Sequence, residues 1–309
     1  MTEFYVDEKD NGKMLTEAIS RRFGKNASGK LFRALRKRDV KIDGNRTGDN
    51  VKLSAGTHVV IYEDFIKEKV NYDILFENDK FIAVNKPQGV PVSEDKNGEK
   101  SLIDALKEDI APKLRLCHRL DRNTGGIVLV AKSDECFEKI KKLFDSEDRQ
   151  IIKKYTCLVS GIVDAKIEIM LENYLFKDSK KSIVYIYDEP RKGAMPCSLR
   201  YRTISTDDVN NISKLEIELI TGRTHQIRAQ LAHIAHPIVG DGKYGREEIN
   251  KKAGYRFQAL WASETAIPLK SGLFYGEDIK AAQTGSERLK MTLYGGEEYI
   301  QIISKPDFR

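Results

Sequence analysis

The stretch HRLDRNTGG, residues 118–126, places a single carboxylate, Asp121, between two arginines. It lies between the apolar runs LRLC (114–117) and IVLVA (127–131) and ends in Thr-Gly-Gly. A carboxylate in such a turn can act as a hydrogen-bond acceptor, a base or a nucleophile. The alternative is structural: Asp121 makes a salt bridge, and Thr-Gly-Gly forms the turn into the following strand. The residues of this stretch alone leave both interpretations open.

The pattern on both sides of this stretch indicates a sheet with interspersed helices. The segment DILFENDKFIAVNKP (73–87) predicts two strands, IVLVAKS (127–133) a third and KKYTCLVSGIV (153–163) a fourth, whereas CFEKIKKLF (136–144) predicts a helix. We therefore expect an α+β domain with a mixed sheet over residues 73–309.

A basic segment precedes this domain. Residues 21–46 contain ten Lys or Arg against Asp39 and Asp43. Apolar residues recur at helical spacing on both sides of residues 26–29, and VKIDGN (40–45) has the Asp-Gly signal of a hairpin. Residues 12–62 resemble the S4 RNA-binding domain, which presents basic residues from two helices and a turn. We expect an S4-like RNA-binding domain over residues 1–62 and a linker over 63–72. Its candidate RNA-binding residues are Arg21, Arg22, Lys30, Arg33, Arg36, Lys37 and Arg38.

Composition sets further limits. The chain has 309 residues, a formal net charge of +6 and no apolar run of the roughly 18 residues that a membrane span needs. Its N-terminus, MTEFYVDEKD, lacks the pattern of a secretory signal. We expect a cytoplasmic protein whose four cysteines are reduced and mostly buried, because none of them forms a closely spaced pair.

Two motif matches fail on their context, and one group of histidines fits no metal motif. GKNASGKL (24–31) has Leu31 where a P-loop needs Ser or Thr, and GDGKYG (240–245) is followed by a polar helix that could not pack on a sheet. His225, His233 and His236 lack the spacing of a known metal motif. We predict neither a nucleotide site nor a metal site.

Four ordered motifs carry a specific resemblance. They are VNKPQGVPV (84–92), HRLDRNTGG (118–126), KKYTCLVSG (153–161) and LITGRTHQIRAQLAHIAHPIVGDGKYG (219–245). Together they resemble the RluA-type family of RNA pseudouridine synthases, and the resemblance spans residues 12–268. With the S4-like segment in front, the chain is similar to members that modify large-subunit ribosomal RNA.

The resemblance implies a largely antiparallel mixed sheet flanked by helices, with the active cleft across its middle. It also implies isomerisation of uridine to pseudouridine in RNA without a cofactor, and we expect a monomer. Asp121, Tyr155 and Arg223 match the catalytic aspartate, the active-site tyrosine and the basic residue that pairs with the aspartate. We expect Thr224 to cap a helix in which Ile227, Leu231 and Ile234 are buried. For contact with RNA or stabilisation of the turn we assign His118, Arg119, His225, Arg228 and, at the cleft floor, Lys86.

Two features remain open. Gly125 stands where the family usually has serine, and residues 270–309 resemble nothing we recognise. The main alternative function is a catalytically silent RNA-binding or ribosome-assembly protein on the same fold. A glycoside-cleaving enzyme ranks third, because hydrolysis of a glycosidic bond generally uses a second carboxylate.

Overall fold

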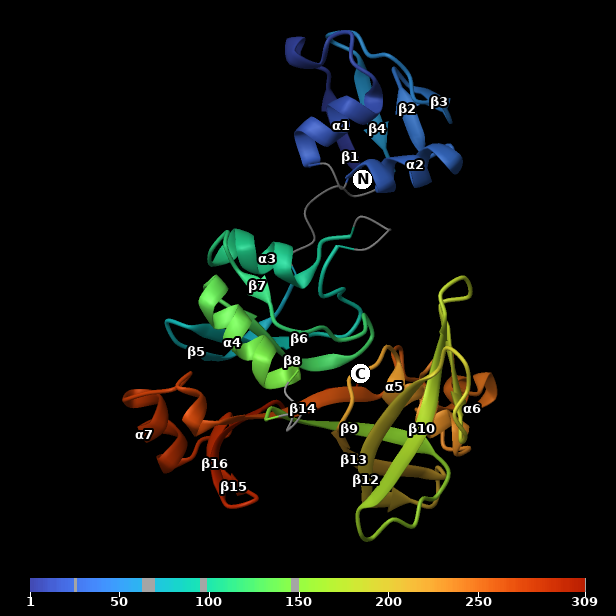
Figure 1. Cartoon of the computed structure of the whole chain (residues 1–309). Coiled ribbons are helices and arrows are strands. Elements are labelled where there is room, and N and C mark those ends of the chain that lie inside the picture. Colours follow the sequence, from blue (N-terminus) through green and yellow to red (C-terminus); the bar gives the residue numbers. More distant parts are fainter. Residues whose placement is uncertain (25–26, 63–69, 95–98, 146–149, 309) are drawn as a thin grey trace. The chain divides into compact units, whose positions relative to one another are not determined.

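The computed structural model describes residues 1–24, 27–62, 70–94, 99–145 and 150–308 (Figure 1). The chain divides into two compact units: residues 1–70 with 93–105, and residues 71–92 with 106–309. Most of the linker predicted over 63–72 lies outside the described residues.

The first unit contains an antiparallel sheet in the order β1-β4-β2-β3 and two helices. Its elements are β1 (Thr2–Tyr5), the 3-10 helix η1 (Glu8–Asp10), α1 (Leu15–Phe23), α2 (Ala27–Arg36), β2 (Val40–Ile42), β3 (Asn45–Thr47) and β4 (His58–Ile61). The two predicted helices and the hairpin are confirmed. Asp43 and Gly44, both with positive φ, form the two-residue turn between β2 and β3. Strand β1 was not predicted.

The second unit holds the predicted strands and a long run of strands that the sequence did not reveal. Its strands are β5 (Asp73–Glu77), β6 (Phe81–Lys86), β7 (Arg115–Leu116), β8 (Gly125–Ala131), β9 (Ile152–Ser160), β10 (Ile169–Asp178), β11 (Ile183–Tyr187), β12 (Met195–Asp207), β13 (Ile212–Leu219), β14 (Leu260–Pro268), β15 (Leu289–Tyr294) and β16 (Glu297–Ile303). Its helices are α4 (Asp134–Asp145), α5 (Gln226–His233), α6 (Glu247–Ala253), the 3-10 helix η2 (Leu269–Ser271) and α7 (Glu277–Thr284), while α3 (Leu102–Asp109) crosses the boundary between the units.

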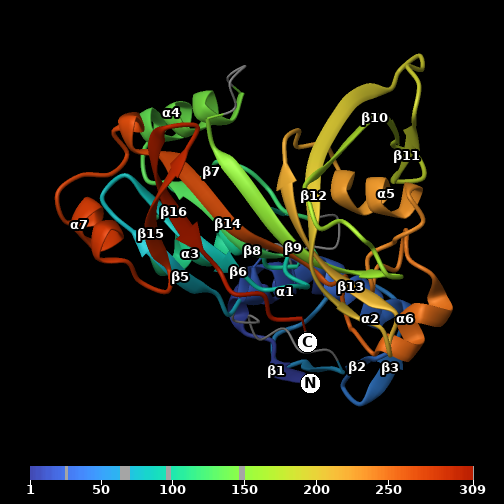
Figure 2. The ribbon, with the colours of Figure 1, turned by 90° about the horizontal axis from the view of Figure 1, so that it is seen from below.

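These strands form one sheet in the order β11-β10-β12-β13-β9-β14-β8-β6-β5, with β16 joined to β14, β15 to β16 and β7 to β8 (Figure 2). Among the strand pairs of the described residues, β8 and β14 alone run parallel. The expected mixed, largely antiparallel sheet is therefore confirmed. Helix α5 lies beside β10 and β11, and α7 beside β15 and β16 (Figure 2).

The core of the second unit includes the C-terminal residues. Every residue of β8 is buried, as a continuous apolar run in a central strand requires. Leu289, Ile300 and Ile302 belong to the same buried cluster as Ile127 and Leu129 of β8. Apolar residues of the segment 270–308, to which the sequence analysis assigned no role, thus complete the core next to the strand that follows Asp121.

Within the described residues, no helix is long and apolar enough to cross a membrane. All four cysteines are free; Cys136, Cys157 and Cys197 are buried, and Cys117 is half-buried.

Candidate active site

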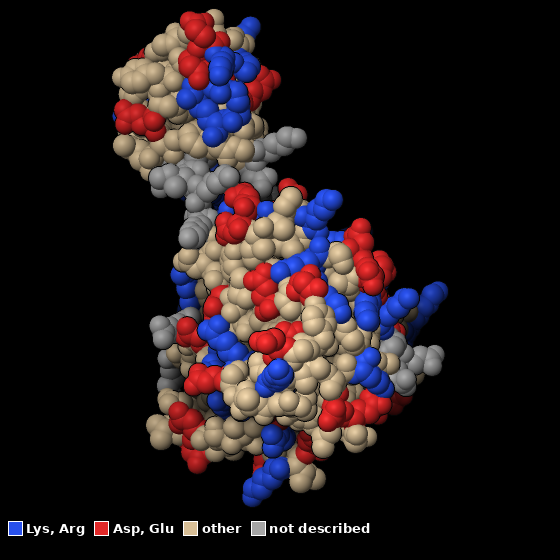
Figure 3. All heavy atoms as spheres, turned by 90° about the vertical axis from the view of Figure 1, so that its left-hand side faces the viewer, with Lys and Arg blue, Asp and Glu red and all other residues tan. Residues whose placement is uncertain are grey.

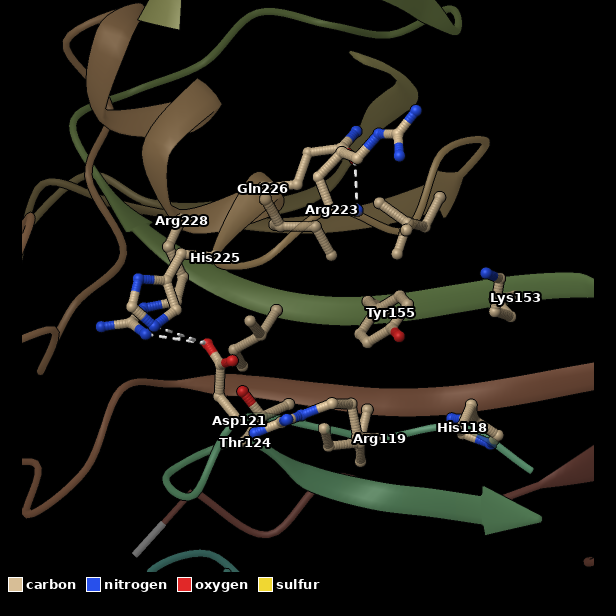
Figure 4. Close-up of a pocket in the computed structure, with 15 residues that line it drawn as sticks. His118, Arg119, Asp121, Thr124, Lys153, Tyr155, Arg223, His225, Gln226 and Arg228 are labelled. Atoms are coloured by element: carbon tan, nitrogen blue, oxygen red, sulfur yellow. Dashed lines mark hydrogen bonds and ion pairs between the residues drawn. The ribbon is translucent and has the colours of Figure 1, made fainter. Parts of the chain in front are cut away.

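A pocket of about 260 Å³ brings three of the sequence motifs together (Figure 4). Asp121 comes from the turn between β7 and β8, Tyr155 from the middle of β9, and Arg228 from the first turns of α5. Other lining residues from these segments are His118, Arg119, Leu120, Thr124, Lys153, Arg223, His225 and Gln226. Among the described residues that line this pocket, Asp121 is the one acid.

The turn that carries Asp121 is held by hydrogen bonds at both of its ends. The backbone N–H of Thr124 donates to the carbonyl of Asp121 at 3.0 Å. Gln258 donates through its amide to Thr124 Oγ1 at 2.7 Å. On the other side, the N–H of Leu129 donates to His118 Nε2 at 3.0 Å, so this nitrogen is an acceptor and the imidazole is neutral. Burial lowers the pKa of His118 to about 3, in agreement with that geometry. His118 therefore stabilises the turn.

Lys86 lies under the same turn and is fully buried. Its Nζ donates to the carbonyls of Pro87 and Val90, each at 2.8 Å, and of Arg122 at 3.0 Å. Burial lowers the pKa of this amine to about 7. The assignment of Lys86 to RNA binding is wrong for this structure, because its side chain joins the end of β6 to the turn and is closed to solvent.

Arg228, rather than Arg223, is the arginine that pairs with Asp121 (Figure 4). Its Nη1 donates to Asp121 Oδ2 at 2.8 Å. Its Nε and Nη2 donate to Asp241 at 2.7 and 2.9 Å, and the side chain of Asp241 is fully buried. Burial opposes the charge of Arg228, yet the two carboxylates raise its pKa above the usual value. Asp241 thus orients Arg228, and Arg228 orients Asp121.

Asp241 belongs to the glycine-rich segment GDGKYG, which proves to be part of this site. The backbone N–H groups of Lys243 and Tyr244 donate to Asp241 Oδ1 at 2.8 and 3.1 Å. Burial would raise the pKa of Asp241, but the hydrogen bonds and charge of Arg228 lower it. In the sequence, Asp241 directly follows PIVG (237–240), and an acid at the end of such an apolar run is a signal for a buried carboxylate.

His225 starts helix α5 and faces the pocket. It is the N-cap residue with φ 53°, so Thr224 is not the cap that we predicted. Its Nδ1 lies 2.9 Å from the hydroxyl of Tyr244, and its Nε2 lies 3.9 Å from Asp121 Oδ2. Because His225 adopts the left-handed conformation, the chain changes direction before α5, and Arg228 in the first turn of this helix faces Asp121. Of the predicted buried stripe, Ile227 and Leu231 are buried, whereas Ile234 is the half-buried C-cap.

Arg223 is exposed at the far edge of the pocket, apart from Asp121 (Figure 4). Its backbone N–H donates to Gln226 Oε1 at 3.1 Å. Its side chain also borders a second, polar pocket that Ser198 and Asn173 help to line. Arg119 is likewise exposed at the pocket edge. Both side chains are accessible to a ligand that enters from solvent.

Tyr155 stands in the pocket wall and is 7% exposed. Burial, with the charge of Asp121 as the second cause, raises the pKa of its phenol well above the usual value. The hydroxyl therefore remains protonated at neutral pH, and the ring is available to contact a ligand beside Asp121.

The basic residues of the first unit fall into two groups. Arg21 and Arg22 are bound to Asp10: Arg21 Nε donates to Oδ1 at 2.6 Å and Arg22 Nε to Oδ2 at 2.9 Å. The hydrogen bonds of Arg21 lead the effects that lower the pKa of Asp10 to about 2. These two arginines serve the fold of the unit, which argues against their predicted contact with RNA.

The second group is accessible to solvent. The face of the first unit seen in Figure 3 carries Lys and Arg next to Asp and Glu, and this view does not identify residues 36–38. In the chain, Arg36, Lys37 and Arg38 are exposed at the end of α2, and Lys30 and Arg33 are half-buried. Arg36, Lys37 and Arg38 therefore remain candidates for contact with RNA.

Comparison with known proteins identifies the class. A family model described as RNA pseudouridylate synthase matches residues 80–233. An uncharacterized RNA pseudouridine synthase from Mycoplasma genitalium is 33% identical over 220 residues, which cover 66% of this chain and 65% of that relative. The ribosomal large subunit pseudouridine synthase C of Haemophilus influenzae is 27% identical over 266 residues, 80% of each chain.

A solved structure shares the fold. Human RNA pseudouridylate synthase domain containing 1 superposes with a TM-score of 0.55 at 24% identity, over 65% of this chain and 80% of that one. The matches assign the protein to the isomerases. More particularly, the chain belongs to the RNA pseudouridylate synthase family.

Proposed function

We propose that this protein converts particular uridines of large-subunit ribosomal RNA to pseudouridine. The observation that carries the proposal is the geometry of Asp121, which shares a pocket with Tyr155 and is bound by an arginine that a second, buried carboxylate orients. Relatives named as large-subunit ribosomal enzymes match most of the chain and support the choice of RNA.

The reaction balances within the nucleoside. The bond from C1′ to N1 breaks, a bond from C1′ to C5 forms, the hydrogen on C5 leaves as a proton, and N1 gains a proton. No electrons are gained or lost overall, and the base and sugar remain on the enzyme. One carboxylate is therefore sufficient, whereas hydrolytic glycosidases use two with separate duties.

In this proposal Asp121 acts directly on the target nucleoside and Arg228 keeps its carboxylate aimed at the pocket. Three courses remain open for Asp121: attack at C1′, addition at C6 of the base, and removal of a proton that leads to a glycal. Tyr155 stacks on the uracil, a contact worth roughly 1 to 3 kcal/mol by analogy with single-strand binders.

A uridine must leave its helix to reach this pocket, at a cost of about a few kcal/mol of unstacking. We propose that contacts elsewhere offset this cost. Arg119 and Arg223 lie at the pocket edge, and residues 36–38 of the first unit supply an exposed basic cluster. In this view the first unit binds ribosomal RNA in the manner expected of an S4-like domain.

The test is release of tritium from unmodified large-subunit ribosomal RNA that carries 5-tritiated uridine, because isomerisation expels the hydrogen at C5. We expect release with the wild-type chain and none with Asp121→Asn in single turnover, while the variant still binds the RNA. Asp164→Asn, at an exposed aspartate outside the pocket, is the matched control and should act as wild type.

The same assay separates the rival functions. Binding without tritium release by the wild-type chain would favour the silent RNA-binding protein, and free uracil as product would favour a glycoside-cleaving enzyme. Tritium release by Asp121→Asn would contradict the role of the carboxylate.

A further inference from the structure

The Trp261 ring leaves no room for a side chain at Gly125. A Cβ built on Gly125 would lie 2.2 Å from Cζ3 and 2.4 Å from Cε3 of Trp261, distances at which one of the two residues must move. The indole ring thus occupies the volume in which the family usually has a serine side chain. Trp261 is 4% exposed and is the only tryptophan in the chain.

The C-terminal residues fix this indole. Its Nε1 donates to Ser304 Oγ at 2.8 Å, and the Ser304 hydroxyl donates to Asn85 Oδ1 at 2.8 Å. Phe308 packs edge-on against the ring at 6.4 Å between centroids. Asn85 belongs to β6, the antiparallel neighbour of β8. The Trp261 indole is therefore held by a chain of hydrogen bonds through Ser304 to Asn85 and by its contact with Phe308.

Strand β14, which carries Trp261, and the residues just before it contact Thr124, Gly125 and Gly126. Trp261 and Ala262 of β14 pair in parallel with Gly125 and Gly126. Gln258, just before β14, donates to Thr124 Oγ1, and the N–H of Thr124 binds the carbonyl of Asp121. Trp261 and Gln258 are thus connected to Asp121 through Gly125 and the buried Thr124.

We propose that Trp261 and Ser304 are positioning residues for the reaction, and that the C-terminal segment 304–308 sets the position of Asp121 through the contact of the indole with Gly125. This inference rests on the proposed function, because its main readout is turnover of uridine. Neither residue lies in the stretch that the family model matches, residues 80–233.

The first test substitutes Gly125 and Trp261 together and compares the double variant with Gly125→Ser alone. Gly125→Ser should lower kcat on the order of 100-fold with KM for RNA unchanged, because a displacement of about 1 Å at a reacting group has that effect. Trp261→Leu removes the part of the ring that meets the new Cβ. The double variant Gly125→Ser with Trp261→Leu should recover kcat to within about tenfold of wild type. Full activity of Gly125→Ser alone, or multiplied losses in the double variant, would overturn the proposal.

The second test uses the smallest change and a readout independent of catalysis. Ser304→Ala removes the acceptor of the indole N–H and should lower kcat about 5- to 10-fold with KM unchanged. Ser271→Ala, at another buried serine of the C-terminal region, is the matched control and should leave kcat unchanged. Equal kcat values for Ser304→Ala and wild type would refute the role of Ser304.

Fluorescence of the single tryptophan distinguishes failure of this inference from failure of the proposed function. Ser304→Ala and Gly125→Ser should each shift the emission maximum and increase quenching by acrylamide, whether or not the wild-type protein turns over RNA. An unaltered spectrum in both variants would overturn the proposed contact, whereas altered spectra without any wild-type turnover would contradict the function alone.

Discussion

Two arginines five positions apart on one motif differ completely in their surroundings. Arg228 binds Asp121 and Asp241, whereas Arg223 is exposed at the pocket edge. The left-handed His225 between them turns the chain, so sequence spacing alone could not tell which arginine faces the carboxylate. The family motif identified the segment that contains the arginine partner of Asp121, but it indicated Arg223, whereas Arg228 makes the contact.

The two arginines should give opposite kinetic results. We expect Arg228→Gln to lower kcat by about 100-fold or more, as does removal of one preorganised donor from an active site, with little change in KM. Arg223→Gln should mainly raise KM, because its side chain reaches solvent rather than Asp121. Steady-state kinetics on ribosomal RNA measure both. A kcat loss from Arg223→Gln as large as that from Arg228→Gln would contradict this assignment.

At the scale of elements, the sequence predicted the helices and strands whose apolar residues form a continuous run or recur at helical spacing. The continuous apolar run IVLVA is buried strand β8, and the amphipathic CFEKIKKLF lies in α4. The sequence left β10 to β13 unassigned. In β12 buried and half-buried residues alternate only over Cys197–Tyr201, and most residues on either side of this stretch are exposed, whereas β13 alternates through Ser213, Leu215 and Ile217. The sequence also left β14 to β16 unassigned, although their apolar residues complete the core. Pairing between strands far apart in sequence decides these elements, and a local pattern does not contain it.

The ion pairs between Asp10 of η1 and the arginines of α1 predict how the stability of the first unit depends on pH. Asp10 is fully buried, and its pKa falls from 3.8 to about 2, chiefly through the hydrogen bonds of Arg21. Because the folded-state pKa is below that of the unfolded chain, the stabilisation is complete well above pH 4 and is lost as the pH falls towards 2. Asp10→Asn should lower the unfolding temperature of the first unit at pH 7 by roughly 5 °C or more.

Calorimetry at several pH values checks this effect. The difference between wild type and Asp10→Asn should shrink between pH 4 and pH 2, because protonation removes the same charge in the wild-type chain. Asp49→Asn, at an exposed aspartate of the same unit, is the control. A difference that stays constant down to pH 2 would show that the charge of Asp10 contributes nothing to the first unit.

At the scale of the whole molecule, the candidate active site and the exposed basic cluster at residues 36–38 belong to different units. The pocket with Asp121 belongs to the second unit, whereas Arg36, Lys37 and Arg38 are exposed in the first. If the first unit supplies affinity for RNA phosphates, removal of its charges should weaken binding without altering the chemical step. The net charge of +6 says nothing about this division, which depends on where the charges lie.

The salt dependence of RNA binding tests whether the first unit supplies the affinity for RNA. Neutralising Arg36, Lys37 and Arg38 to Gln should weaken RNA binding and make the slope of log K against log salt shallower by roughly 2 to 3, since each phosphate contact releases about 0.7 to 0.9 of a counterion. The same charge change on α4, with Lys139, Lys141 and Lys142 replaced by Gln, is the control and should leave the slope unaltered if the first unit carries the contacts. With saturating RNA, kcat should match wild type in both variants, because Asp121, Tyr155 and Arg228 are untouched. An unchanged slope after neutralisation of residues 36–38, or an equal change on α4, would contradict a specific role for the first unit in holding the RNA.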